Sequence, residues 1–290
     1  MRRLRLSRLF AVILSLTLLG GCARLAIRLS PSLVENLKGS LFEECDPEFA
    51  REAIPANLKI LEGLLKSDPG NKRILTALSM GFGGYALLFV ESEDPARASR
   101  FYLRSRDYGV RALGNKGEVL SHPDRREEGI QRGLQGMDKD DLEALFWTTF
   151  AWNAWINLNL DKPAALAQLG ASQACLKKIL EIDSTYFYGL PYILDGVMLA
   201  ARSPMFGGDV GQARSRFQRA MEISHRHFFL AQYYCAGTYA IRTQDKELFR
   251  SLIQEIIHGD AQALREVCLI NTMIQRKAKA LEQQMHELFD

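Results

Sequence analysis

From about Pro47 to the C-terminus, the sequence is a succession of segments with the apolar spacing of amphipathic helices, separated by short turn signals. No stretch alternates between apolar and polar residues for long enough to predict a half-buried strand. The composition agrees, because the 290 residues include 42 leucines and 30 alanines but only 8 valines. Leucine and alanine favour helix, whereas valine favours strand. We therefore predict an all-α fold and exclude a β-sandwich, a barrel and a parallel-sheet α/β fold.

The predicted helices are bounded by turn and capping signals. They cover residues 47–66, 71–91, 94–113, 140–160, 162–182, 186–202, 209–224, 228–242, 244–258 and 261–289. Residues 68–71, Asp-Pro-Gly-Asn, form a strong turn signal, and Asp94 precedes a proline suited to the first helical position. Residues 161–163 and 207–209 are interpreted as helix starts in the same way.

The N-terminus has the pattern of a bacterial lipoprotein signal peptide, residues 1–21. Four arginines precede the apolar run Leu9–Leu19, which is about half the roughly 20 residues needed to span a bilayer. The run ends in Leu19-Gly20-Gly21-Cys22, which resembles the lipobox, in which the cysteine becomes the lipidated first residue. The alternative is an ordinary signal sequence with a chance cysteine. Residues 22–46 are then a lipid-anchored tether and a first short helix.

Removal of this leader changes the charge balance of the chain. The full chain carries a net charge of +3, and the four arginines lie within residues 1–21. The remaining 269 residues therefore carry a net charge of about −1. We predict a nearly neutral domain, residues 47–290, that reaches a membrane only through its lipid anchor and does not bind nucleic acid.

Residues 114–140 interrupt the helical pattern with five glycines among charged residues. We interpret this segment as a long excursion between helices, with room for one short helix. Long loops are often functional or mobile, but a solvated insertion is the favoured interpretation.

Paired helices with short turns suggest a degenerate array of tetratricopeptide-like helical hairpins. Ala213, Phe217 and Ala220 match the small–aromatic–small pattern of the second helix of that repeat. Similar Glu-Ile segments recur at residues 181–184, 222–225 and 255–258, with spacings of 41 and 33 residues. The second spacing is close to the 34-residue tetratricopeptide period.

We find no sequence support for catalysis, a cofactor or a metal. The pairs Glu222/His225 and Glu255/His258 have the spacing of carboxylate-bundle ligands, but both fall at predicted helix ends. No nucleophile elbow, phosphate-binding glycine loop or zinc-protease motif is present. Buried free thiols are the default for the cysteines that follow the leader, although an unassigned disulfide is an alternative. These are Cys45, Cys175, Cys235 and Cys268.

The segment 145–157 holds all three tryptophans of the chain on a helix that is apolar nearly all round. A polar stripe at helical spacing runs through it. One interpretation is a central core helix, and the other is the wall of a ligand cavity or pore. The candidate lining residues are Trp147, Thr149, Trp152, Asn153, Trp155 and Asn157.

Small residues gather on one face of the predicted 71–91 helix, at Ala77, Gly81 and Gly84. Glycine inside a helix costs on the order of 1 kcal/mol relative to alanine. A close helix crossing is the default explanation, and an opening for a ligand is the alternative.

Several ordered segments resemble the T component of tetratricopeptide-associated TRAP transporters, the tripartite ATP-independent periplasmic family. The matching segments are 83–91, 97–108, 151–157, 205–209, 213–220, 244–249 and the helix from about residue 271. The resemblance covers the chain from about residue 40 to its end. The proline that closes several repeats in the family is replaced here by Ser184 or His225.

The resemblance implies a periplasmic lipoprotein that forms a homotrimer and binds the periplasmic solute-binding protein, or P component, of a transporter. It also implies a pore that passes a hydrophobic or organic-acid ligand. Gly207, Gly208 and Asp209 are interpreted first as a turn and helix cap, and second as a trimer or partner contact.

Two other function classes remain open at the level of sequence. One is a tetratricopeptide scaffold lipoprotein for envelope assembly, and the other is an enzyme with a cryptic site. The residue after the lipobox cysteine, Ala23, is not the aspartate that retains lipoproteins in the inner membrane. The outer membrane is therefore slightly favoured.

Overall fold

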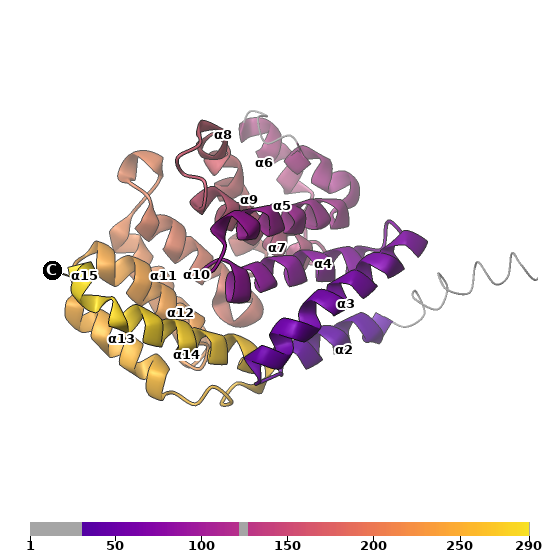
Figure 1. Cartoon of the computed structure of the whole chain (residues 1–290). Coiled ribbons are helices and arrows are strands. Elements are labelled where there is room, and N and C mark those ends of the chain that lie inside the picture. Colours follow the sequence, from indigo (N-terminus) through magenta and orange to yellow (C-terminus); the bar gives the residue numbers. More distant parts are fainter. Residues whose placement is uncertain (1–30, 122–126, 290) are drawn as a thin grey trace, which may run out of the picture.

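The computed structural model describes residues 31–121 and 127–289 (Figure 1). Every regular element in these residues is helical, which confirms the predicted all-α class. The signal peptide and the lipobox with Cys22 lie outside the described residues.

The first half of the described chain holds helices of very different lengths. In order they are α2 (Pro31–Phe42), α3 (Pro47–Ser67), α4 (Lys72–Tyr85), the π-helix η1 (Ala86–Val90), α5 (Pro95–Ala112), the 3₁₀ helix η2 (Gly114–Ser121), α6 (Glu127–Gln135), α7 (Leu142–Asn157) and α8 (Pro163–Leu166).

The second half continues in the same way. It comprises α9 (Leu169–Asp183), α10 (Tyr186–Ala201), the 3₁₀ helix η3 (Pro204–Phe206), α11 (Val210–Ile223), α12 (Leu230–Tyr234), the π-helix η4 (Cys235–Ala240), α13 (Lys246–His258), the 3₁₀ helix η5 (Arg265–Val267), α14 (Cys268–Gln283) and α15 (Met285–Phe289).

Capping side chains define several helix starts. Asp94 and Asp209 each accept a hydrogen bond from the backbone N–H three residues later, as predicted. Asn71 caps α4 in the same way, after the predicted turn. Asp161 does not cap a helix: Lys162 occupies the position before α8 and makes no side-chain cap bond. The predicted 261–289 helix is also too long, because α14 begins only at Cys268.

Helices that follow one another in sequence pack side by side. The core is built on α4, α5 and α7, and α10 and α11 form a second closely packed pair. Towards the C-terminus α13 packs on α14, and α14 returns to α2 and α3 (Figure 1). The assignment of these pairs to tetratricopeptide repeats remains a prediction.

A disulfide joins the two ends of the described chain. Cys45, between α2 and α3, is bonded to Cys268 at the start of α14, with a Cα–Cα distance of 5.2 Å. The default of free thiols is therefore wrong for this pair, because the pairing depends on a tertiary contact across 223 residues. Cys175 and Cys235 are free and buried, as expected, and burial raises the pKa of each thiol to about 12.

The described part of the 114–140 excursion is packed rather than solvated. It forms η2 and α6, and α6 contacts both η2 and α9. Leu120 is fully buried and Ile130 nearly so. A Cβ at Gly133 would approach the Val119 side chain to 2.6 Å, so this glycine allows α6 to lie against η2. The charged residues of this segment favoured a solvated insertion in the sequence analysis, because its few apolar residues make their contacts only in the folded protein.

Among the described residues, Lys72–Val90 is long and apolar enough to cross a membrane. Most of this segment is buried inside the protein, where it forms the central α4 and η1.

Candidate functional site

Helix α7 lies in the middle of the fold because almost every face of it is apolar. Phe146 and Trp152 have no exposed surface, and neither does Asn153, on the predicted polar stripe. Such a helix can be stable only when other helices surround it on all sides.

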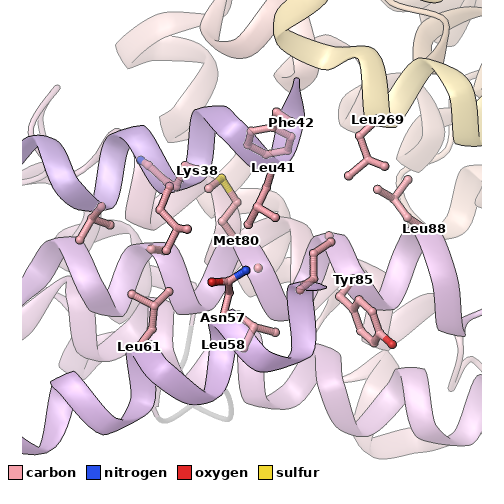
Figure 2. A pocket seen from close by; sticks show the side chains of 16 residues that line it. Lys38, Leu41, Phe42, Asn57, Leu58, Leu61, Met80, Tyr85, Leu88 and Leu269 are labelled. Atoms are coloured by element: carbon pink, nitrogen blue, oxygen red, sulfur yellow. The ribbon is translucent and has the colours of Figure 1, made fainter. Parts of the chain in front are cut away.

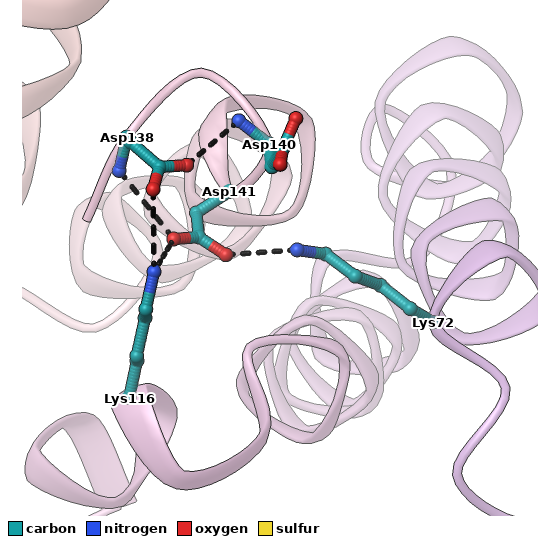
Figure 3. Close-up of polar contacts among 5 residues, drawn as sticks. All are labelled: Lys72, Lys116, Asp138, Asp140 and Asp141. Atoms are coloured by element: carbon teal, nitrogen blue, oxygen red, sulfur yellow. Dashed lines mark hydrogen bonds and ion pairs between the residues drawn. The ribbon is translucent and has the colours of Figure 1, made fainter. Parts of the chain in front are cut away.

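Asp141, directly before α7, makes no side-chain cap bond to this helix but binds two lysines of other elements (Figure 3). Its carboxylate accepts hydrogen bonds from Lys72 Nζ at 2.8 Å and from Lys116 Nζ at 2.5 Å. Burial alone would raise the pKa of Asp141, but the two lysines together lower it below its ordinary value. The cluster links α4 and η2 to α7 and is a structural feature.

A cavity of about 280 Å³ adjoins α7. Its wall comes from η1, α7, α10 and α12 together with residues that directly follow them. The lining residues are Leu87, Glu91, Phe146, Phe150, Asn153, Ala154, Asn157, Leu158, Leu190, Ile193, Leu194, Val197, Leu230 and Tyr234. Apolar walls with a few polar groups are typical of small-molecule sites.

The polar groups of this cavity differ in how far they are already hydrogen-bonded. Asn153 donates to the Thr149 carbonyl, and its Oδ1 accepts from Ser172 Oγ and Arg202 Nη2. Among the described residues, no hydrogen-bond partner exists for the side chain of Asn157 or the hydroxyl of Tyr234. These two groups are available to a ligand.

Glu91 is the acidic group of the cavity. It accepts a hydrogen bond from the Tyr102 hydroxyl through Oε2. Burial raises the pKa of Glu91 above its ordinary value, although the Tyr102 bond and the charge of Lys277 oppose this shift. Burial of Tyr102 and of Tyr234 raises the pKa of each hydroxyl, so both phenols stay protonated.

Two π-helical segments border the cavity. Leu87 lies in η1, which ends directly before Glu91, and Tyr234 directly precedes η4. Inserted π-turns are frequent at functional sites. Here they accompany the two polar residues that lie opposite α7.

The predicted lining residues fall into two groups. Asn153 and Asn157 line the cavity. The three tryptophans and Thr149 are not among the lining residues. Trp147 Nε1 donates to the Tyr186 hydroxyl at 3.3 Å, and Trp152 Nε1 donates to Gln168 Oε1 at 2.8 Å.

The other two members of the second group also have core contacts. Thr149 Oγ1 donates to the Leu145 carbonyl, and Trp155 is partly buried against the core. Its carbonyl accepts a bond from Asn159. A role for the tryptophans and Thr149 at a pore remains a prediction.

A second, smaller hollow of about 70 Å³ lies beneath α2 (Figure 2). Ala77, Gly81 and Gly84 all line it, together with Met80 and Tyr85. A Cβ at Gly81 would meet Leu58 at 2.5 Å, which fits the expected close crossing of α3 and α4. A Cβ at Gly84 would meet nothing within 4 Å, so close packing does not explain that glycine.

The first turn of α10 contains three consecutive residues with positive φ. Phe187, Tyr188 and Gly189 have φ values of 43°, 59° and 79°. This conformation costs a residue with a side chain roughly 1–2 kcal/mol. The rings of Phe187 and Tyr188 pack on Phe228, and these ring contacts offset part of that cost.

Residues 207–209 form the predicted turn and cap. Gly207 adopts φ 81°, and a Cβ at Gly208 would come within 2.0 Å of the Arg202 carbonyl oxygen. Both positions therefore require glycine. The neighbouring Met205 and Phe206 are exposed. A partner or trimer contact at Gly207, Gly208 and Asp209 remains a prediction.

The two Glu-x-x-His pairs do not form a metal site among the described residues. Glu222 forms an ion pair with Arg219, and Glu255 forms one with Arg226. His225 lies beyond the end of α11 with φ 48°. No cluster of potential metal ligands occurs among the described residues.

Glu91 and Tyr234 are cavity residues that the sequence did not single out as ligand contacts. Glu91 ends the resembling segment 83–91, but nothing in its spacing places it at a cavity. The apolar wall from α10 has no local signature, because buried leucines look alike whether they face a cavity or a neighbouring helix.

Comparison with known proteins shows the family of the chain. The sequence model of the family described as TRAP transporter T-component matches residues 43–289, nearly the whole chain. A search of curated proteins finds no match. The chain therefore belongs to the TRAP transporter T-component family, which serves transport rather than catalysis.

Proposed function

We propose that this protein is a periplasmic lipoprotein that binds the solute-binding (P) component of a TRAP transporter and helps to deliver its solute. The match to the T-component family over residues 43–289 carries this proposal. The lipobox at residues 19–22 supports a lipid anchor on Cys22.

The cavity beside α7 supports a direct role in handling the solute. It is mostly apolar, and two of its polar lining residues, Asn157 and Tyr234, have no side-chain hydrogen-bond partner among the described residues, as expected for a ligand site. We place the solute here during transfer, and we propose that three copies of the chain assemble around their partners. Within this proposal the anchor lies in the outer membrane.

Co-purification from the native bacterium tests the proposal. Tagged protein with an intact Cys22 is isolated after mild cross-linking, and Cys22→Ala is the control for membrane attachment. We expect a periplasmic solute-binding protein to be isolated together with the tagged protein. We expect Cys22→Ala to be absent from the membrane fraction. Recovery of outer-membrane assembly factors in its place would favour the envelope scaffold and contradict the transport role.

A further inference from the structure

The charge of the cavity beside α7 limits which solutes it can hold. Among the described residues that line it, Glu91 is the one carboxylate, and none is lysine, arginine or histidine. Glu91 Oε1 has no hydrogen-bond donor in the described part of the chain, whereas Oε2 accepts from Tyr102. An acceptor is therefore free at the polar end of an apolar chamber.

Two described cations interact with lining residues of the cavity without lining it themselves. Lys277 lies near enough to Glu91 to influence its charge, but it lines a separate surface hollow with Arg51 and Glu93. Arg202 Nη2 already donates a hydrogen bond to Asn153 Oδ1 at 3.0 Å. Neither residue lines the cavity, so an anionic solute would meet no cation there.

The size of the cavity limits the apolar body of the solute. An apolar cavity of about 150 Å³ is large enough for benzene. By that comparison, the 280 Å³ here suits a molecule of about ten non-hydrogen atoms. Phe146 and Phe150 of α7 and the leucines of α10 would surround such a body.

We propose that this cavity binds a small apolar amine, with its protonated nitrogen bonded to Glu91 and Tyr234 and its apolar body against α7 and α10. A buried cation is stable only when it is paired and hydrogen-bonded, and Glu91 supplies that pair. A carboxylate in the same place would put two like charges together, and one of them would have to be protonated. The inference rests on the proposed transport function and names the solute class.

Three probes with one apolar body and different heads test the proposal: 2-phenylethylamine, 2-phenylethanol and phenylacetate. Their binding to the full chain in lipid nanodiscs is measured by calorimetry against empty nanodiscs. We expect the amine to bind about tenfold or more tightly than phenylacetate, as for a charge-assisted hydrogen bond. Equal or tighter binding of phenylacetate, or no binding of any probe, would overturn the proposal.

Variants locate the binding in the cavity. Glu91→Gln keeps the shape of the side chain and an acceptor for Tyr102. We therefore expect it to weaken binding of the amine about tenfold, and to change the affinity for the alcohol much less. Leu194→Trp fills the chamber and should abolish binding of all probes. Glu93→Gln changes an exposed carboxylate outside the cavity and is the matched control. Unchanged amine binding in Glu91→Gln contradicts the inference.

Binding of the solute-binding protein to the same variants separates the two proposals. If that protein binds while the probes show no preference for the amine, the solute class alone is wrong. If the amine preference holds while the solute-binding protein does not bind, the transport role is wrong and the site stands.

Discussion

Asn153 and Asn157 lie one turn apart on α7, yet they have opposite roles in stability. The Oδ1 of Asn153 accepts from Ser172 and from the buried Arg202, whose Nε and Nη1 have no other partner among the described residues. Asn157 has no side-chain partner there and faces the cavity. The amide of Asn153 is therefore the hydrogen-bond acceptor of the buried Arg202, whereas the amide of Asn157 can bond to a ligand.

Replacing each asparagine by alanine should separate these roles. We expect Asn153→Ala to lower the free energy of unfolding by about 2–3 kcal/mol, because a buried guanidinium loses its acceptor. Asn157→Ala should change it by less than about 0.5 kcal/mol. Urea denaturation of the two variants measures the difference. Equal effects would contradict the assigned contacts.

The cost of keeping Glu91 ionised in the core should be visible as a dependence of stability on pH. Because its pKa in the folded protein lies above the ordinary value, wild type loses stability as the pH rises through that pKa. We expect Glu91→Gln to be more stable than wild type near neutral pH, with a difference that shrinks below pH 4.5. Melting curves at several pH values measure it. A variant less stable at neutral pH would show that the Tyr102 bond outweighs burial.

Replacing Asp209 tests the helix cap that the sequence predicted at the start of α11. Asp209→Ala removes the acceptor for the Gln212 N–H at 2.9 Å and should lower the free energy of unfolding by about 1 kcal/mol. Asp209→Asn keeps an acceptor and is the control. Binding of the partner protein should not change in either variant. A selective loss of binding in Asp209→Ala would instead assign this turn to a contact surface.

At the scale of elements, the return of α14 to the N-terminal helices depends in part on one covalent bond. The Cys45–Cys268 disulfide closes a loop of 223 residues. Removing a native disulfide from a small secreted domain typically costs about 2–5 kcal/mol. We expect Cys45→Ser to lower stability by an amount in this range and to be insensitive to reductant, whereas Cys235→Ala keeps the bond and should respond to reductant like wild type. If reduction of wild type leaves its denaturation midpoint unchanged, the bond does not hold these elements together.

Local signals predicted helices better than they predicted breaks within helices. Asp94 and Asp209 located two starts correctly, because a cap is a contact within four residues. The left-handed turn at Phe187 and Tyr188 depends on packing against Phe228, 40 or more residues away. No local pattern reports such a contact. The same reason explains the packed η2–α6 segment, whose apolar partners lie in other helices.

At the scale of the whole molecule, the sequence predicted the fold class and two of the cavity residues. Asn153 and Asn157 were found because a polar stripe on an apolar helix is a local pattern. Glu91, Tyr234 and the α10 wall were not, because the cavity exists only where four separate helices meet. A close helix crossing was the default for the small-residue face of α4, and this holds at Gly81 but not at Gly84.

The proposed transport role is tested most directly by one affinity measurement. The full-length protein in nanodiscs is immobilised and titrated with each TRAP-class solute-binding protein of the same bacterium. We expect saturable binding with a Kd of about 1 μM or tighter and no binding to a solute-binding protein of an unrelated transporter. Absence of binding to any solute-binding protein of the TRAP class would contradict the proposed function.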